Sequence, residues 1–207
     1  MSPLPTLRQR KKVRTRDALA AAALRLSRER GYERVTIDDI TAEAEVSRRT
    51  FFRYFASKEA ALFPRYGLRL AHFRDQLRER PHGEAPFETV ERAFLAVARL
   101  YMRERDEIVA QQRVVDASPS LVAFERLLDR DWERAVATAL EPARGGGGSA
   151  GRRARVLAGA TMGAVRATLR EWFDGGGRAD LVALGREAFA LLAMAGAPAA
   201  RAGGGRR

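Results

Sequence analysis

The chain has 207 residues, 46% of them apolar, and a net charge of +12 that arises from 38 basic and 26 acidic side chains. It contains no cysteine and two histidines, which excludes disulfides and thiolate metal sites and leaves little material for a zinc or catalytic centre. The basic N-terminus lacks the apolar segment of a secretory signal, and no uncharged apolar run approaches the ~20 residues that span a membrane. We therefore expect a cytoplasmic protein with no metal, no other cofactor and no membrane partner.

Basic residues concentrate at the beginning of the chain. Residues 1–60 hold 14 Lys or Arg and 8 Asp or Glu, which gives half of the net charge in under a third of the length. Between Arg8 and Arg16 the cations follow one another without an acidic residue. Such a cluster is typical of an arm that binds polyanions, although a solubilising tail would have the same composition. We expect residues 1–13 to be a disordered basic arm.

Apolar residues recur at helical spacing along almost the whole chain, and no segment alternates convincingly as a half-buried strand does. A first helix is expected at about 15–30, where Gly31 ends it. Its inward face would carry Leu19, Ala22, Ala23 and Leu26. A second helix, 36–44, begins at Thr36, where Asp39 completes a capping box. A third, 48–54, follows Ser47 as its N-cap.

The remaining segments predict longer helices. One runs from Ser57 to Arg80 with a kink at Pro64, because proline cannot donate the helical hydrogen bond. Others are expected at about 87–101, 106–117, 121–136, 152–173 and 179–195, with a turn at 81–86 and a flexible linker at 145–151. The predicted fold is all-α with about nine helices. The predicted parts are a three-helix helix-turn-helix domain (14–57), a larger helical regulatory and dimerisation domain (58–195) and a disordered tail (196–207).

The two short helices at 36–44 and 48–54 are separated by the turn Glu45-Val46-Ser47, which is helix-turn-helix spacing. In DNA-binding examples, the first residues of the second helix contact base edges in the major groove. Arginine can bridge guanine O6 and N7, and threonine offers a hydroxyl and a methyl group to thymine. This favours Arg48, Arg49 and Thr50 as base readers with their charged side outward. An amphipathic helix with solvated arginines and buried rings is the alternative.

Aromatic residues alternate with these arginines. Phe51 and Phe55 are four apart and can enter the core, which leaves Phe52 and Tyr54 on other faces, where a ring can meet a sugar and a phenol can reach a phosphate. Thr36 and Lys58 are expected at helix N-termini that can accept a phosphate. The full candidate DNA-binding set is Thr36, Ser47, Arg48, Arg49, Thr50, Phe52, Arg53, Tyr54 and Lys58.

Residues 28–63 closely resemble the DNA-binding domain of the tetracycline-repressor (TetR/AcrR) family of bacterial transcriptional regulators. The matching motifs are Gly31-Tyr32, Thr36 to Ile40, the block from Val46 to Phe55, and Ser57-Lys58-Glu59. The resemblance covers about residues 14–63, and the rest of the chain matches in architecture alone. It implies a homodimeric repressor that binds a palindromic operator in double-stranded DNA and loses affinity when a small-molecule effector binds its larger domain.

The same resemblance assigns roles by position. Thr36, Tyr54 and Lys58 would hold phosphates, and Arg48, Arg49, Thr50 and Phe52 would face the groove. One position departs from the family: Glu45 stands where the turn usually has glycine. A non-glycine residue with positive φ costs on the order of 1 kcal/mol.

The larger domain offers two sets of candidates. The last two predicted helices are apolar enough to form a seam between subunits, or else to be buried within one subunit. The seam candidates are Leu157, Ala160, Val165, Leu169, Trp172, Phe173, Leu181, Leu184, Ala188, Leu191 and Leu192. A ligand pocket among the helices from 60 to 140 would be lined by Phe73, Phe94, Tyr101, Gln111, Gln112, Phe124 and Trp132, for which an ordinary core role is the alternative.

Two other classes of protein compete with a DNA-binding regulator. A helical enzyme would have to use His72 or His82, and neither has a nucleophile or a carboxylate constellation nearby in the sequence. A helical adaptor could use the basic end to bind RNA, acidic lipid or a partner protein. Such an adaptor would bind any polyanion equally, whereas a regulator would discriminate between DNA sequences. We expect a regulator without enzymatic activity.

Overall fold

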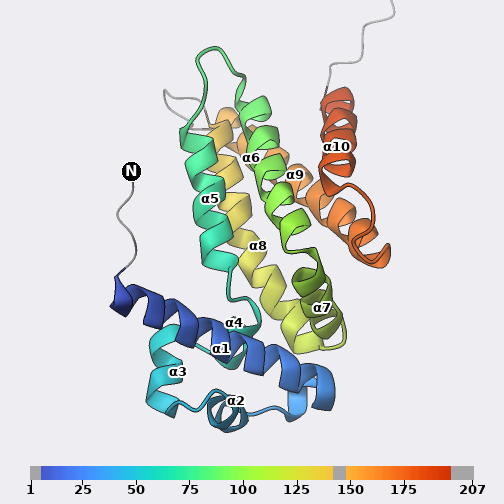
Figure 1. Ribbon diagram of the computed structural model, residues 1–207. Helices are drawn as coiled ribbons and strands as arrows, with labels where there is room; N and C mark the ends of the chain where they lie inside the picture. Colours follow the sequence, from blue (N-terminus) through green and yellow to red (C-terminus); the bar gives the residue numbers. More distant parts are fainter. Residues whose placement is uncertain (1–5, 142–147, 197–207) are drawn as a thin grey trace, which may run out of the picture. The chain divides into compact units, whose positions relative to one another are not determined.

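The computed structural model describes residues 6–141 and 148–196, and in these ranges every regular element is a helix (Figure 1). The all-α prediction is confirmed. The elements are α1 (Leu7–Arg30), a 3₁₀ turn η1 (Tyr32–Arg34), α2 (Ile37–Glu43), α3 (Arg48–Tyr54), α4 (Lys58–Leu62), α5 (Tyr66–Arg78), α6 (Pro86–Arg103), α7 (Arg105–Asp116), α8 (Pro119–Leu140), α9 (Ser149–Asp174) and α10 (Leu181–Gly196). None of these helices combines the length and apolar character needed to cross a bilayer.

Two predicted helices differ clearly from the structure, and other helix ends shift by up to four residues. α1 begins at Leu7 rather than near residue 15, so the part of the predicted disordered arm from Leu7 to Val13 is helical. The residues there are good helix formers without an apolar stripe, so periodicity alone misses them. The predicted helix from Ser57 to Arg80 is two helices, α4 and α5, separated at Pro64. The predicted tail beyond Gly196 and residues 145–147 of the predicted flexible linker lie outside the described residues, whereas residues 149–151 of that linker are helical and begin α9.

The chain forms two compact units. The first runs up to Arg74 and also includes Glu104–Asp131, and the second comprises Asp75–Arg103 and the residues from Trp132 onward. The core of the first unit contains the predicted inward face of α1, with Leu19, Ala22, Ala23 and Leu26 all buried. Side chains from far along the chain, Val115 in α7 and Leu121 in α8, are fully buried in the same core. This core therefore holds the short N-terminal helices against the corner between α7 and α8.

The segment between α4 and α5 is held by polar contacts within the first unit. Arg16 of α1 donates to the carbonyl of Pro64. The guanidinium groups of Arg65 and Arg69 both donate to the carboxylate of Glu104, at 2.7 and 2.8 Å. These contacts join the helix-turn-helix region to the start of α7.

The second unit is built around α6, α9 and α10. Trp172 is fully buried there, and its indole Nε1 donates to the carbonyl of Ala179 at 3.0 Å. Of the two alternatives for Trp172, burial within one subunit therefore holds, since the indole lies in the core of its own chain. α10 approaches α6 closely at Gly185, where a Cβ atom would lie 2.9 Å from the Leu95 side chain.

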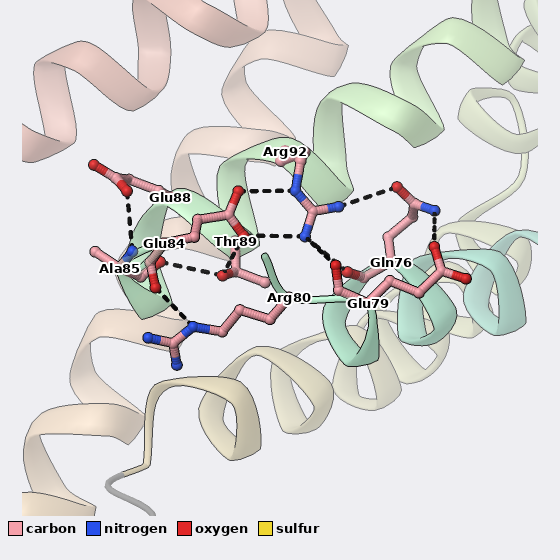
Figure 2. Close-up of polar contacts among 8 residues, drawn as sticks. All are labelled: Gln76, Glu79, Arg80, Glu84, Ala85, Glu88, Thr89 and Arg92. Atoms are coloured by element: carbon pink, nitrogen blue, oxygen red, sulfur yellow. Dashed lines mark hydrogen bonds and ion pairs between the residues drawn. The ribbon is translucent and has the colours of Figure 1, made fainter. Parts of the chain in front are cut away.

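The corner between α5 and α6 is closed by Arg92, as Figure 2 shows. Its Nε and Nη2 donate to the two carboxylate oxygens of Glu84, at 2.9 and 3.1 Å. The same guanidinium donates to the side chain and the backbone carbonyl of Gln76, at 3.2 and 3.0 Å. The nearby guanidinium lowers the pKa of Glu84. A planar fork fits this bidentate arrangement, which a lysine could not reproduce.

Candidate nucleic-acid interface

The turn between α2 and α3 has the geometry that the sequence predicts. Thr36 caps α2, accepting from the amide of Asp39 at 3.1 Å, while the Asp39 carboxylate accepts from the Thr36 amide at 2.8 Å. Ser47 caps α3 through a bond from the amide of Thr50 at 3.2 Å. Glu45 has a φ of 53° and is the single non-glycine residue with positive φ in the described parts of the chain. The predicted strain at this turn is therefore present.

α3 presents one face to the core and another to solvent. Phe51 and Phe55 are buried, with ring centroids 5.8 Å apart, and they fix the helix against the first unit. Phe52 is 48% exposed, which is unusual for a phenylalanine. The side chains of Arg48, Arg49 and Arg53 are also exposed, whereas Thr50 and Tyr54 are half-buried. The predicted division is confirmed for the three phenylalanines, whereas Tyr54 packs partly against the core.

The three arginines of α3 differ in their contacts. Nη1 of Arg48 donates to both carboxylate oxygens of Asp38, at 3.0 and 2.9 Å, so this guanidinium is paired within the protein rather than extending freely. Arg53 lies over the ring of Tyr54 at 5.2 Å. Arg49 has no hydrogen bond or ion pair with any described residue. The sequence did not single out Asp38 as the partner of Arg48, because that contact depends on the angle between the two helices.

Two predicted phosphate contacts have partners inside the protein. Nζ of Lys58 donates to the carbonyls of Tyr32 and Val35, at 3.0 and 2.8 Å, and lies 4.0 Å from the Tyr32 ring. The Tyr32 hydroxyl in turn donates to Glu59 at 2.7 Å, and burial together with this bond raises the pKa of the phenol. The Thr36 hydroxyl donates to Asp39 at 2.5 Å. Both predicted phosphate ligands therefore also stabilise the fold of this region.

The first two turns of α1 add a basic helical surface. Arg8, Arg10, Lys11, Lys12 and Arg14 are all exposed, and none of them forms an ion pair with a described residue. Their charges are therefore available to a polyanion. Because the segment is helical, its cations are spread around a rod instead of along an extended arm.

The candidate ligand residues are divided between the two units. In the second unit, Phe94 is buried and stacks on Trp132 with centroids 6.0 Å apart, and Tyr101 lies edge-on to Trp172 at 6.4 Å. In the first unit, Phe73 is fully buried and Phe124 packs against Phe63 at 5.6 Å.

The two candidate glutamines belong to α7 in the first unit. Gln112 donates to Asp116 at 3.0 Å. Gln111 lines an open hollow of about 390 Å³ beside α1, together with residues such as Leu24 and Arg28. No group of three or more His, Cys, Asp or Glu in the described parts of the chain could hold a metal ion.

Comparison with known proteins decides the family. Residues 19–63 match the sequence model of bacterial regulatory proteins of the tetR family, and residues 84–197 match that of the MftR C-terminal domain. The HTH-type transcriptional regulator TcmR of Streptomyces glaucescens is 36% identical over 176 residues, which cover 82% of this chain and 77% of TcmR. The chain belongs to the TetR family. It is therefore a DNA-binding transcriptional regulator with a helix-turn-helix. The family indicated by the sequence resemblance is confirmed.

Solved structures agree with this assignment. FadR of Thermus thermophilus, a TetR-family transcriptional repressor solved in complex with lauroyl-CoA, is 26% identical and superposes with a TM-score of 0.57, covering 92% of this chain and 100% of FadR. SmeT, solved in complex with triclosan, gives a TM-score of 0.62 at 16% identity and covers 88% of this chain and 91% of SmeT. The second likeness shows that the two chains share a fold.

Proposed function

We propose that this TetR-family protein is a homodimeric repressor that binds a palindromic operator through α3 and leaves it when a small molecule binds the C-terminal helices. The observation that carries the proposal is the exposure of Arg48, Arg49 and Phe52 on a helix whose opposite face is anchored by Phe51 and Phe55. Packing of this helix against the core does not require two arginines and an exposed phenylalanine ring on the opposite face. A DNA groove accommodates all three.

Within this proposal the side chains of the interface have distinct tasks. Arg48, Arg49 and Thr50 lie in the first turn of α3 and read base edges, with the Phe52 ring against sugar or a thymine methyl. Tyr54, Lys58 and the capped N-terminus at Thr36 hold phosphates, assisted by Arg53. The basic turns of α1 bind phosphates beside the reading helix and make affinity depend on salt.

A dimer is proposed because one reading helix rarely provides enough specific contact, and a twofold pair reads half-sites about 34 Å apart. Its interface would be formed by α9 and α10. Large apolar side chains are exposed on both helices of the single chain: Val156 is 65% exposed, Leu191 61% and Met194 74%. A second copy that covers them would remove this apolar surface from water.

The effector is proposed to have a substantial apolar part. Lauroyl-CoA is bound to the related FadR of Thermus thermophilus, and triclosan to SmeT, which has the same fold. In this chain the second unit holds a stacked aromatic pair, buried Phe94 and half-buried Trp132, which would form an apolar wall of such a site. Phe73, Tyr101, Gln111, Gln112 and Phe124 stay as predicted pocket residues.

The test is selection of bound duplexes from random and genomic DNA, followed by the double variant Arg48→Ala, Thr50→Ala. Wild type should recover a palindrome, and the variant should lose roughly 5- to 150-fold in discrimination between that palindrome and a scrambled duplex. Its circular dichroism spectrum should be unchanged, because both side chains lie outside the core. Arg126→Ala, an exposed substitution on α8, serves as the control. Unchanged sequence preference in the double variant would refute the assignment of α3, and equal binding to any polyanion would favour an adaptor.

A further inference from the structure

The ion pair between Asp38 and Arg48 places a negative charge at the surface that is proposed to bind DNA. Asp38 is 70% exposed on the side of α2 that meets α3, so its carboxylate lies beside the proposed reading helix. Arg48 is itself 59% exposed, and such open ion pairs contribute little to stability, about 0–1 kcal/mol. A carboxylate at this place also repels the phosphates of DNA. Stability therefore does not account for the pair.

Helix capping does not account for Asp38 either. The α2 N-terminus is already closed by the reciprocal bonds between Thr36 and Asp39. Asp38 and Asp39 both lie in the first turn of α2 and supply negative charge at the positive end of the helix dipole, an effect that does not require the contact with Arg48. Asp38 makes its side-chain contacts with Arg48 instead, 10 residues further along the chain.

The geometry around Arg48 constrains the guanidinium from two sides. Asp38 holds Nη1 through both carboxylate oxygens, and the Phe52 ring lies 5.9 Å from the guanidinium carbon. Nε and Nη2 of Arg48 make no hydrogen bond with any described residue. These two donors form one edge of the planar fork, which matches the paired acceptors O6 and N7 of guanine.

We propose that Asp38 is a specificity-determining residue that orients Arg48 toward a guanine in the operator. The proposal rests on the function inferred above. Asp38 acts in two ways: it fixes the free edge of the guanidinium toward the bases, and its charge disfavours a position in which Arg48 settles on a phosphate. In the groove, where less water surrounds the pair, the attraction between the two side chains is stronger than in the free protein. Removing the carboxylate should therefore increase binding to every duplex and weaken the choice of base.

The experiment compares Asp38→Asn with Glu45→Gln by duplex selection and by titration at fixed salt. Both variants remove one negative charge near the reading helix, but Glu45 has no contact with Arg48. Both should bind scrambled DNA more tightly, by a similar factor. Only Asp38→Asn should lose base discrimination, by at least about fivefold, at the operator position that Arg48→Ala also relaxes. Thermal melting checks that Asp38→Asn is folded, and Phe52→Leu, which removes the second constraint, should relax the same position.

A double-variant cycle completes the test. Asp38→Asn added to Arg48→Ala should cause no further loss at that position, because the carboxylate acts through the guanidinium. The inference is overturned if Asp38→Asn keeps the base preference of wild type or behaves like Glu45→Gln. It is also overturned if the losses of base discrimination in Asp38→Asn and Arg48→Ala add in the double variant. If wild type itself selects no sequence, the proposed function fails first, which is a separate result.

Discussion

At the scale of single residues, Glu45 holds a backbone conformation that favours glycine. Its φ of 53° puts Cβ close to the neighbouring carbonyl, which costs on the order of 1 kcal/mol in a residue with a side chain. We expect Glu45→Gly to relieve this strain and raise the melting temperature by a few degrees. Ala42→Gly in the adjacent helix should have the opposite effect, at a cost of about 1 kcal/mol. A melting temperature that falls in both variants would contradict this account.

Single residues also show what local sequence can predict. The caps at Thr36 and Ser47 and the strained turn at Glu45 depend on neighbours within three positions, and all three are present as predicted. The ion pair of Arg48 with Asp38 and the bonds of Lys58 to Tyr32 and Val35 depend on how separate helices meet. The spacing of residues along the sequence does not determine the angle between packed helices, so these contacts could not be predicted.

At the scale of elements, η1 is tied to the corner between α7 and α8 through one carboxylate. Oε1 of Glu33 accepts from the hydroxyls of Ser118 and Ser120, at 2.7 and 2.8 Å, and Ser118 is buried. These hydrogen bonds lower the pKa of Glu33 below its ordinary 4.5. The stability that these hydrogen bonds contribute is therefore fully present above the ordinary pKa. It is lost as the pH falls through the lower pKa of the folded state.

This linkage predicts a difference in acid stability. Glu33→Gln should melt at a lower temperature than wild type at pH 7, because a neutral amide is a weaker acceptor than a carboxylate. Between pH 5 and about pH 3 it should lose less stability than wild type, since it has no proton to take up at this site. Melting curves across that pH range measure the effect, with the exposed Glu187→Gln as control. Parallel curves for wild type and Glu33→Gln would contradict the role assigned to the carboxylate.

Element boundaries could be predicted only where the signal is local. Gly31 ends α1 and Ser57 caps α4 as expected, because both act through the adjacent backbone. The start of α1 at Leu7 was missed, since its first turns bury no apolar face. Pro64 was expected to kink one helix and instead separates two, and the ties of Arg16 and Arg65 at that segment have no sequence signature.

At the scale of the whole molecule, the proposed dimer predicts a clear effect of one substitution. Leu191→Arg on α10 places a charge on an exposed apolar side chain, so it should dissociate the dimer without disturbing the protomer. Leu184, by contrast, is half-buried, and an arginine there would also disturb folding. Sedimentation velocity should show a monomer, whereas Leu68→Arg on α5, 62% exposed in wild type, should stay dimeric. A persistent dimer in Leu191→Arg would place the interface elsewhere.

The C-terminal part of the chain was the least predictable from sequence. Its aromatic residues recur at helical spacing, which is the same pattern whether a ring fills a core or lines a cavity. Trp172 illustrates the ambiguity, because its assignment to the interior comes from its burial and its bond to Ala179 in the structure. Family membership likewise fixes the kind of regulator, whereas the effector proposed above depends on the individual side chains of this chain.

The shared core of the first unit has a consequence for hybrid regulators. A transplant of residues 1–63 onto the body of another family member would leave Leu19, Leu26 and Phe51 in a core where foreign side chains replace Val115 and Leu121. Such a chimaera would have the new DNA preference, but the side chains of its core would come from two parents and pack poorly. Moving the stretch from Glu104 to Asp131 together with the N-terminal helices keeps both sides of that interior from the same parent.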